Sequence, residues 1–115
     1  MDTRSKIVRS DELDRRANGK PIRWVRGIFD PLLAEHARRL EQLRSPESCL
    51  AVVIEDSARP LLPVQARAEL VAALAAVDFV VFEANGVAPE DLEDLLIREQ
   101  FSDHVRRRHC GNGAG

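Results

Sequence analysis

The 115-residue chain is 44% hydrophobic and 31% charged, which is the composition of one soluble globular domain with a single core. Its net charge of −2 gives no indication of a nucleic-acid-binding surface, and its longest apolar runs are too short to span a bilayer. Residues 1–20 do not resemble a signal peptide, and two cysteines, Cys49 and Cys110, make no disulfide framework, so we expect a cytoplasmic protein.

The first predicted element is a short helix over residues 10–17. Ser10 is a good N-cap, and the carboxylates of Asp11 and Glu12 suit the positive end of a helix. The pair at residues 18–19, Asn-Gly, is typical of a left-handed helix stop. Because the segment has few apolar residues, we expect it to pack at the edge of the fold.

A strand is predicted over residues 21–27. Its alternate side chains fall on two faces, with Ile22, Trp24 and Arg26 on one and Arg23 and Val25 on the other. The two arginines make this strand less apolar than a central strand of a parallel sheet usually is.

The next helix is predicted over residues 31–43. Asp30 and Pro31 form a good pair of N-cap and first helical residue, and the Ser-Pro pair at 45–46 ends the helix. Spacings of three and four residues place one set of side chains on a common face: Leu33, His36, Ala37, Leu40 and Arg44.

The remaining elements alternate between strand and helix. Residues 49–56 form an apolar run ending in carboxylates, which predicts a buried parallel strand. Residues 64–77 predict a helix, and residues 78–83 predict a third strand. Pro89 opens an acidic helix over residues 89–101, and we expect the glycine-rich tail at 111–115 to be disordered.

This order predicts an α/β fold, a Rossmann-like parallel sheet of about three strands with flanking helices, as a single domain over residues 1–110. Ligands of such sheets bind beyond the carboxyl ends of the strands. The turn formed by Gly27, Ile28, Phe29 and Asp30 lies at such an end, next to a helix N-terminus, and predicts a phosphate site. The alternative is a tight strand-to-helix turn in which Asp30 only caps the helix.

Three stretches occur in the order KIVRSDELDRRANGKPI, GIFDPLLAEHARRLEQLR and RPLLPVQARAELVAALAAVDFVVF. Together they resemble the cytidylyltransferase-like nucleotidyltransferases, and among them the adenylyltransferase domains of bacterial ADP-heptose synthases. The resemblance implies that Gly27, Ile28, Phe29, Asp30 and His36 bind a nucleotide or phosphate. It implies His36 as the catalytic residue, which stabilises charge at the α-phosphate, and Mg²⁺ with ATP or CTP as the cofactor of an active enzyme.

The chain departs from this family at three places. The family's His-x-Gly-His tetrad falls on residues 33–36, where Leu33 replaces the first histidine and Glu35 replaces the glycine. The stretch IEDSARP lacks the family's basic loop and its lysine. Two further strands and a Ser/Thr-rich motif are not recognised after Phe82. These departures predict a degenerate site in a truncated fold.

Other polar residues have a structural interpretation beside a functional one. Glu55 and Asp56 are candidates to hold a ribose or a metal, or are solvated strand ends. Arg59 and Arg67 match positions of the family, and we expect Arg67 to brace its helix. The basic run over residues 104–110 is a candidate anion or partner contact, or a solvated helix end, and its His-Cys pair has too few neighbouring ligands for a zinc site.

Three functions remain open. The first is a degenerate nucleotidyltransferase-like domain without catalysis that binds a nucleotide or phosphate weakly. The second is an active adenylyl- or cytidylyltransferase that joins a nucleotide to a sugar phosphate or glycerol phosphate, with missing groups supplied by another chain. The third is a protein-interaction module without a ligand. His36 itself has two interpretations, a phosphate ligand near a helix N-terminus or a half-buried histidine on an apolar helix face.

The family's strand order predicts that the first strand is an exposed sheet edge, which Arg23 and Arg26 would protect. We expect a homodimer through this edge or through the C-terminal helix, with no nucleic-acid or membrane partner.

Overall fold

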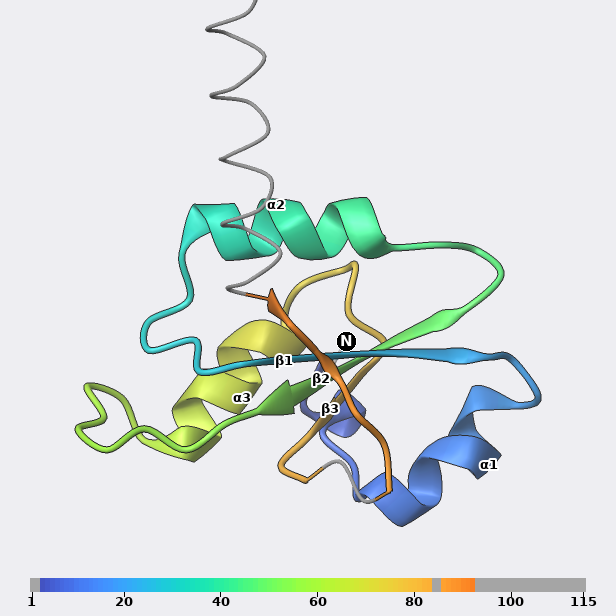
Figure 1. Cartoon of the computed structure of the whole chain (residues 1–115), viewed down its shortest axis with the longest axis horizontal. Helices are drawn as coiled ribbons and strands as arrows, with labels where there is room; N and C mark the ends of the chain where they lie inside the picture. Colours follow the sequence, from blue (N-terminus) through green and yellow to red (C-terminus); the bar gives the residue numbers. More distant parts are fainter. Residues whose placement is uncertain (1–2, 84–85, 93–115) are drawn as a thin grey trace, which may run out of the picture.

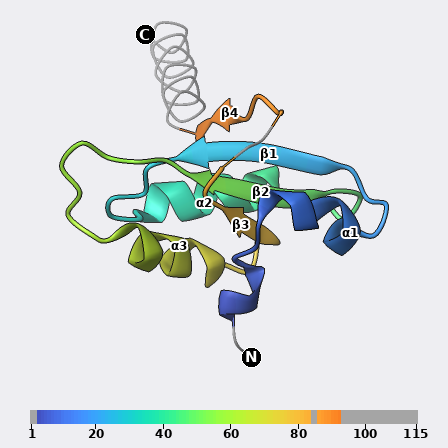
Figure 2. The same cartoon turned by 90° about the horizontal axis from the view of Figure 1, so that it is seen from below.

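The computed structural model describes residues 3–83 and 86–92 and has an α/β fold built on one parallel sheet (Figure 1). The strands lie in the order β3-β2-β1-β4 (Figure 2). They are β1 (Ile22–Gly27), β2 (Cys49–Ile54), β3 (Phe79–Val81) and β4 (Glu90–Asp91). The helices are α1 (Leu13–Ala17), α2 (Ala34–Leu43) and α3 (Val64–Ala72), preceded by the 3₁₀ turns η1 (Thr3–Lys6) and η2 (Ser10–Glu12). The predicted α/β parallel sheet is confirmed, with four strands where about three were expected.

Two hydrophobic clusters cover the two faces of the sheet. Alternate residues of β2 enter each cluster, so that Leu50 and Val52 pack with residues of α2 and α3, whereas Ala51 and Val53 pack with residues of α1. All six residues of β2 are buried. Because helices cover both faces, the strand has no polar face, which accounts for its uninterrupted apolar sequence.

The prediction that β1 forms an exposed edge is wrong. Strand β4 pairs with it in parallel, with Val25 opposite Glu90 and Arg26 opposite Asp91. An Arg23–Glu90 ion pair at 3.1 Å and an Arg26–Asp91 ion pair at 3.1 Å accompany the pairing. The arginines that make β1 unusually polar therefore neutralise the acidic segment beside it. The predicted alternation is confirmed, since Val25 packs in one cluster and Trp24 against the other.

The acidic helix predicted from Pro89 is also corrected, since Glu90 and Asp91 form β4 instead. Their carboxylates pair with the arginines of β1, which favours an extended backbone at this position. The remainder of that predicted helix, the basic run at 104–110 and the predicted tail at 111–115 lie outside the described residues.

The predicted helix over residues 10–17 is a 3₁₀ turn followed by α1, and its left-handed stop is confirmed by φ angles of 54° at Asn18 and 84° at Gly19. Leu13 is fully buried, so this helix packs on a face of the sheet and not at the edge of the fold. The segment before it covers the outer edge of β3, where the amide of Val8 donates to the carbonyl of Val80 at 2.9 Å. The strands and the helix predicted over residues 49–83 are all present with shorter bounds.

Candidate functional site

An open hollow of about 430 Å³ lies where β1 and β2 end, beside the start of α2 and the loop that leads to α3. This is the end of a parallel sheet at which ligands of α/β folds bind. The lining residues come from the turn after β1, from the first turn of α2 and from that loop: Ile28, Phe29, Asp30, Pro31, Leu33, His36, Ser57, Arg59 and Leu61. The structure thus brings four of the five predicted site residues together. Ser57 and Leu61 are lining residues that sequence reasoning missed, although both lie in stretches that were compared with the family, IEDSARP and RPLLPVQARAELVAALAAVDFVVF.

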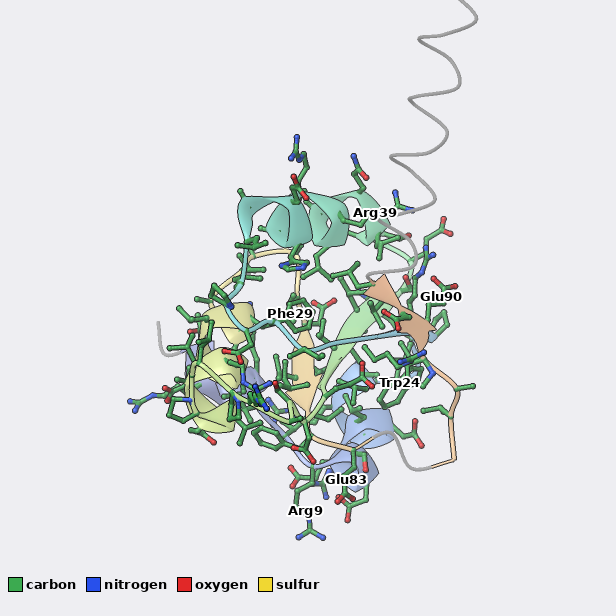
Figure 3. All side chains as sticks on the ribbon, turned by 60° about the vertical axis from the view of Figure 1, so that its left-hand side comes forward. Arg9, Trp24, Phe29, Arg39, Glu83 and Glu90 are labelled. Atoms are coloured by element: carbon green, nitrogen blue, oxygen red, sulfur yellow. The ribbon has the colours of Figure 1, made fainter. Side chains whose placement is uncertain are left out.

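The remaining predicted residue, Gly27, has a packing role. A Cβ at this position would lie 2.7 and 2.8 Å from two ring atoms of Phe29. Phe29 itself has a left-handed backbone with φ of 55° and is only 2% exposed. Figure 3 shows its ring in the interior, whereas Arg9 extends away from the body of the protein. Gly27 therefore allows the turn to fold Phe29 back over the end of β1.

Asp30 does not cap the helix that follows it. Its carboxylate instead accepts hydrogen bonds from the amides of Leu61, at 2.7 Å, and Leu62, at 2.8 Å. The bond between Asp30 and Pro31 is cis, and α2 begins only at Ala34. The prediction of a helix from residue 31 is wrong because Asp30 is held by the loop before α3, which removes the predicted N-cap.

His36, and not Asp30, makes the side-chain contact at the start of α2. Its Nδ1 accepts the amide hydrogen of Leu33 at 3.0 Å, and its ring lies edge-on to Phe29 with the centroids 5.4 Å apart. His36 is 6% exposed, whereas Leu33 is 51% exposed. The prediction that these two residues share one helix face is therefore wrong. A neutral imidazole that accepts at Nδ1 carries its hydrogen on Nε2. His36 is thus a buried residue that organises the helix start and also lines the hollow.

The buried side chain of Arg67 on α3 joins the loops around the hollow by hydrogen bonds. It is 2% exposed and donates to the carbonyl oxygens of Ile28 and Glu55, both at 2.9 Å, and of Leu62 at 3.2 Å. The carbonyl of Ile28 lies in the turn after β1, that of Glu55 lies just after β2, and that of Leu62 lies just before α3. The sequence indicated that Arg67 braces its own helix, but its bonds join three loops.

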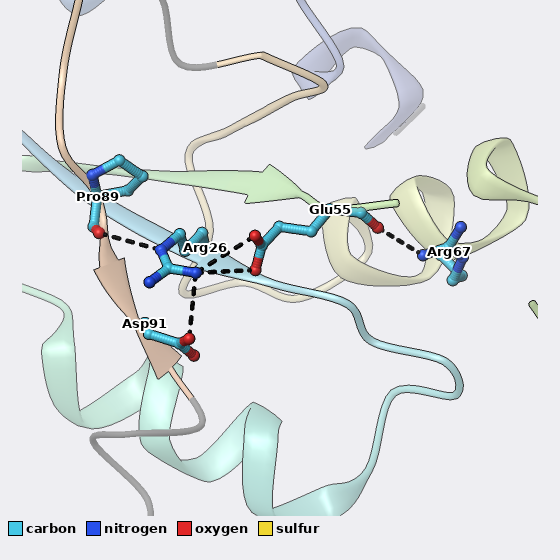
Figure 4. A network of polar contacts seen from close by, with 5 residues as sticks. All are labelled: Arg26, Glu55, Arg67, Pro89 and Asp91. Carbon is cyan, nitrogen blue, oxygen red and sulfur yellow. Dashed lines mark hydrogen bonds and ion pairs between the residues drawn. The ribbon is translucent and has the colours of Figure 1, made fainter. Parts of the chain in front are cut away.

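Glu55 connects the loops that Arg67 joins to the β4 edge of the sheet (Figure 4). Its carboxylate accepts hydrogen bonds from Arg26 at 3.3 Å, and the same guanidinium pairs with Asp91 and donates to the carbonyl of Pro89 at 3.4 Å. The carboxylate of Glu55 is therefore engaged with Arg26 in this structure, and Asp56 is exposed. Sequence reasoning missed Arg26 as a network residue, because the register of the sheet decides that Glu55 and Asp91 are its partners.

Arg59 is the exposed cation of the lining. Asp30 is the acid of the lining, and both of its oxygens are engaged by amides, so it is poorly placed to bind Mg²⁺. Within residues 3–83 and 86–92, no three His, Cys, Asp or Glu side chains are grouped closely enough to bind a metal ion. In the same ranges no helix has the length and apolarity needed to cross a membrane.

Cys49 is a free, buried thiol on β2, far along the strand from the hollow. Burial raises the pKa of the Cys49 thiol above its ordinary value of 9.0, and the negative charge of Asp78 raises it further, whereas Lys20 acts in the opposite direction. A thiol held in its protonated form is a poor nucleophile, so this residue is part of the core and not of a reactive site.

The sheet order, the strand-to-helix turn and the hollow define a Rossmann-like α/β domain with an open site at the carboxyl ends of its strands. No family model matches the sequence. The chain is 43% identical over 77 residues to bifunctional protein HldE of Alkalilimnicola ehrlichii, covering 59% of this chain and 16% of that protein. It is 37% identical over 99 residues to HldE of Ectopseudomonas mendocina, and 39% identical over 99 residues to HldE of Pseudomonas fluorescens. These matches cover 78% and 74% of this chain.

The chain is therefore homologous to a part of the HldE proteins, and the resemblance to ADP-heptose synthase noted in its sequence is confirmed. It spans about a fifth of the length of these curated relatives.

Proposed function

We propose that this nucleotidyltransferase-like domain does not catalyse nucleotidyl transfer and binds a nucleotide or phosphate weakly in the hollow. The observation that carries the proposal is the pair of residues at the start of α2. Leu33, which is 51% exposed and lines the hollow, stands where the resemblance implies a histidine. Glu35, which is exposed, stands where it implies a glycine.

These two replacements act against phosphoryl chemistry in different ways. Leu33 has no hydrogen-bond donor, and the loss of one preorganised donor to a developing negative charge typically lowers the rate about 10²- to 10³-fold. Glu35 adds a negative charge near the expected polyphosphate, and two like charges about 4 Å apart in a partly solvated site repel by a few kcal/mol. Both effects oppose stabilisation of the transition state.

The features that support weak binding are the shape of the site and Arg59. A hollow of about 430 Å³ is within the size range of small-molecule sites. Arg59 supplies a guanidinium, which suits phosphate oxygens. With one exposed cation and two nearby carboxylates, Asp30 and Glu35, a millimolar dissociation constant is expected, equivalent to about −4 kcal/mol.

Calorimetric titration with ATP and with CTP, each with Mg²⁺, tests the binding. We expect weak binding that Arg59→Ala abolishes. Arg38→Ala is the matched control, because Arg38 is an exposed arginine of α2 that does not line the hollow. Absence of binding at millimolar nucleotide, or equal loss in both variants, would contradict a site at Arg59.

The catalytic part is tested separately by pyrophosphate release. The alternative function is an active transferase that uses ATP or CTP with Mg²⁺ on a sugar phosphate or glycerol phosphate. We expect no release of pyrophosphate above background with either acceptor. Sustained release that the His36→Ala variant loses would establish the alternative.

A further inference from the structure

The hollow offers a ligand one accessible cation. Arg59 is exposed, and among the lining residues that the structure describes it is the one lysine or arginine. Arg67 lies behind the wall, where it is 2% exposed and donates its hydrogen bonds to carbonyl oxygens. His36 adds no positive charge, because its Nδ1 accepts the amide hydrogen of Leu33. A bound anion can therefore pair one of its charged groups with a guanidinium at this surface.

Two carboxylates oppose a second anionic group. That of Asp30 is fixed in the wall by two loop amides. Glu35 is exposed, and it lies in the first turn of α2 between Leu33 and His36, which both line the hollow. It forms no ion pair or side-chain hydrogen bond within the part of the chain that the structure describes. One helical turn rises only about 5.4 Å, so the charge of Glu35 lies within about one Debye length of an anion in the hollow.

The rim of the hollow is apolar. Ile28, Leu33 and Leu61 are 40%, 51% and 77% exposed, and all three line the hollow. A ligand that covers such side chains gains free energy only if it brings apolar or aromatic surface of its own. A small, fully polar anion would leave this rim in water.

We propose that the ligand of the hollow carries a single phosphate on an aromatic or apolar body, as a nucleoside monophosphate does, and that Glu35 disfavours polyphosphates. This inference rests on the proposed function, since it names the class of nucleotide that binds. The phosphate pairs with Arg59, and the body covers Leu33 and Leu61. Each further phosphate of a di- or triphosphate finds no second accessible cation and meets the charge of Glu35.

Calorimetric titration with AMP, ADP and ATP tests the part played by charge. All three are titrated at one ionic strength in EDTA, without Mg²⁺, so that the phosphates of each nucleotide keep their full charge. We expect the dissociation constant to rise along the series, by about fivefold or more from AMP to ATP, because the added charges are repelled by Glu35 at about 8 Å.

Glu35→Gln should lower the dissociation constant of ATP more than that of AMP and so reduce their ratio. Glu47→Gln is the matched control. It removes the same charge from an exposed residue that precedes β2, at the opposite end of the strand from the hollow, and it should leave the ratio unchanged.

Ribose 5-phosphate tests the part played by the rim, since it has one phosphate and no base. We expect it to bind about tenfold more weakly than AMP, because it covers little apolar surface. Leu61→Ser should reduce this difference. Leu70→Ser should keep it, since Leu70 is 45% exposed on α3 and does not line the hollow.

The outcomes separate this inference from the proposed function. If ATP binds as tightly as AMP or more tightly, the inference is overturned and weak nucleotide binding stands. Equal effects of Glu35→Gln and Glu47→Gln, or equal binding of ribose 5-phosphate and AMP, overturn the inference in the same way. If none of the three nucleotides binds, the proposed nucleotide site is overturned together with it.

Discussion

Asp30 and Leu61 are hydrogen bonded across the wall of the hollow: the Oδ2 atom of Asp30 accepts the amide hydrogen of Leu61 at 2.7 Å. Leu62 makes the equivalent bond to Oδ1 at 2.8 Å. These two bonds and the three carbonyls bound by Arg67 join the turn after β1 to the loop before α3. The shape of the hollow is therefore held by polar contacts between loops, and not by the sheet alone.

Asp30→Asn should destabilise the protein. An amide side chain has one acceptor oxygen, so at least one of the two loop amides loses its partner, at a cost of about 1–3 kcal/mol. Urea unfolding measures the free energy of unfolding. Asp56→Asn is the control, because Asp56 is an exposed acid of the adjacent loop, and its effect should stay within about 0.5 kcal/mol. Equal stability of the two variants would show that the Asp30 contacts contribute nothing.

Gly27→Ala should destabilise the protein by about 1–3 kcal/mol, because the new Cβ meets the ring of Phe29 at 2.7 and 2.8 Å. The same substitution in a Phe29→Leu background should cost less, since the smaller side chain leaves room. A double-mutant cycle from urea unfolding gives this coupling. If the cost of Gly27→Ala is the same in both backgrounds, contact with the ring is not its cause.

The two arginines of β1 should differ in their contribution. Arg26 contacts Glu55, Asp91 and the carbonyl of Pro89, whereas Arg23 pairs with Glu90. Half-exposed ion pairs contribute little singly, and a network contributes more. We expect Arg26→Met to lower the free energy of unfolding by about 1–2 kcal/mol and Arg23→Met to lower it by less than about 0.5 kcal/mol. A larger loss for Arg23→Met would contradict the network at Glu55.

Cys49 should give the stability a specific dependence on pH. Burial, followed by the charge of Asp78, raises the pKa of this thiol in the folded state above 9.0. The contribution of the buried Cys49 thiol to the free energy of unfolding is therefore fully present below pH 9.0. It is lost as the pH rises through the pKa of the folded state, because the thiol ionises more readily in the unfolded state. The difference in unfolding free energy between wild type and Cys49→Ala, measured with reductant, should shrink above pH 9.0. A difference that grows with pH would contradict the sign of the shift.

Local sequence patterns were sufficient to predict most of the fold. The apolar run of β2 predicted a strand buried on both faces, and the pair Asn18-Gly19 predicted the end of the first helix. The resemblance to the nucleotidyltransferases rested on stretches in the correct order, and the HldE homologues confirm it. These features depend on backbone preference and on side-chain periodicity, which act over a few residues.

The sequence could not identify the partners of its polar side chains. Asp30 has the local context of an N-cap, but two amides from residues 61–62 compete for its oxygens and bind them. Glu90 and Asp91 suit a helix start, but Arg23 and Arg26 hold them in a strand beside β1.

By itself, then, the sequence determined the α/β class, the central strand and the position of the turn beyond β1. Only the tertiary structure decided that Asp30, His36 and Arg67 serve to organise the loops, and that Leu33 and Leu61 are exposed at the hollow. The physical reason is the range of the interactions. Helix and strand patterns arise from neighbours along the chain, whereas hydrogen bonds and ion pairs go to whichever partner the fold brings within about 3 Å.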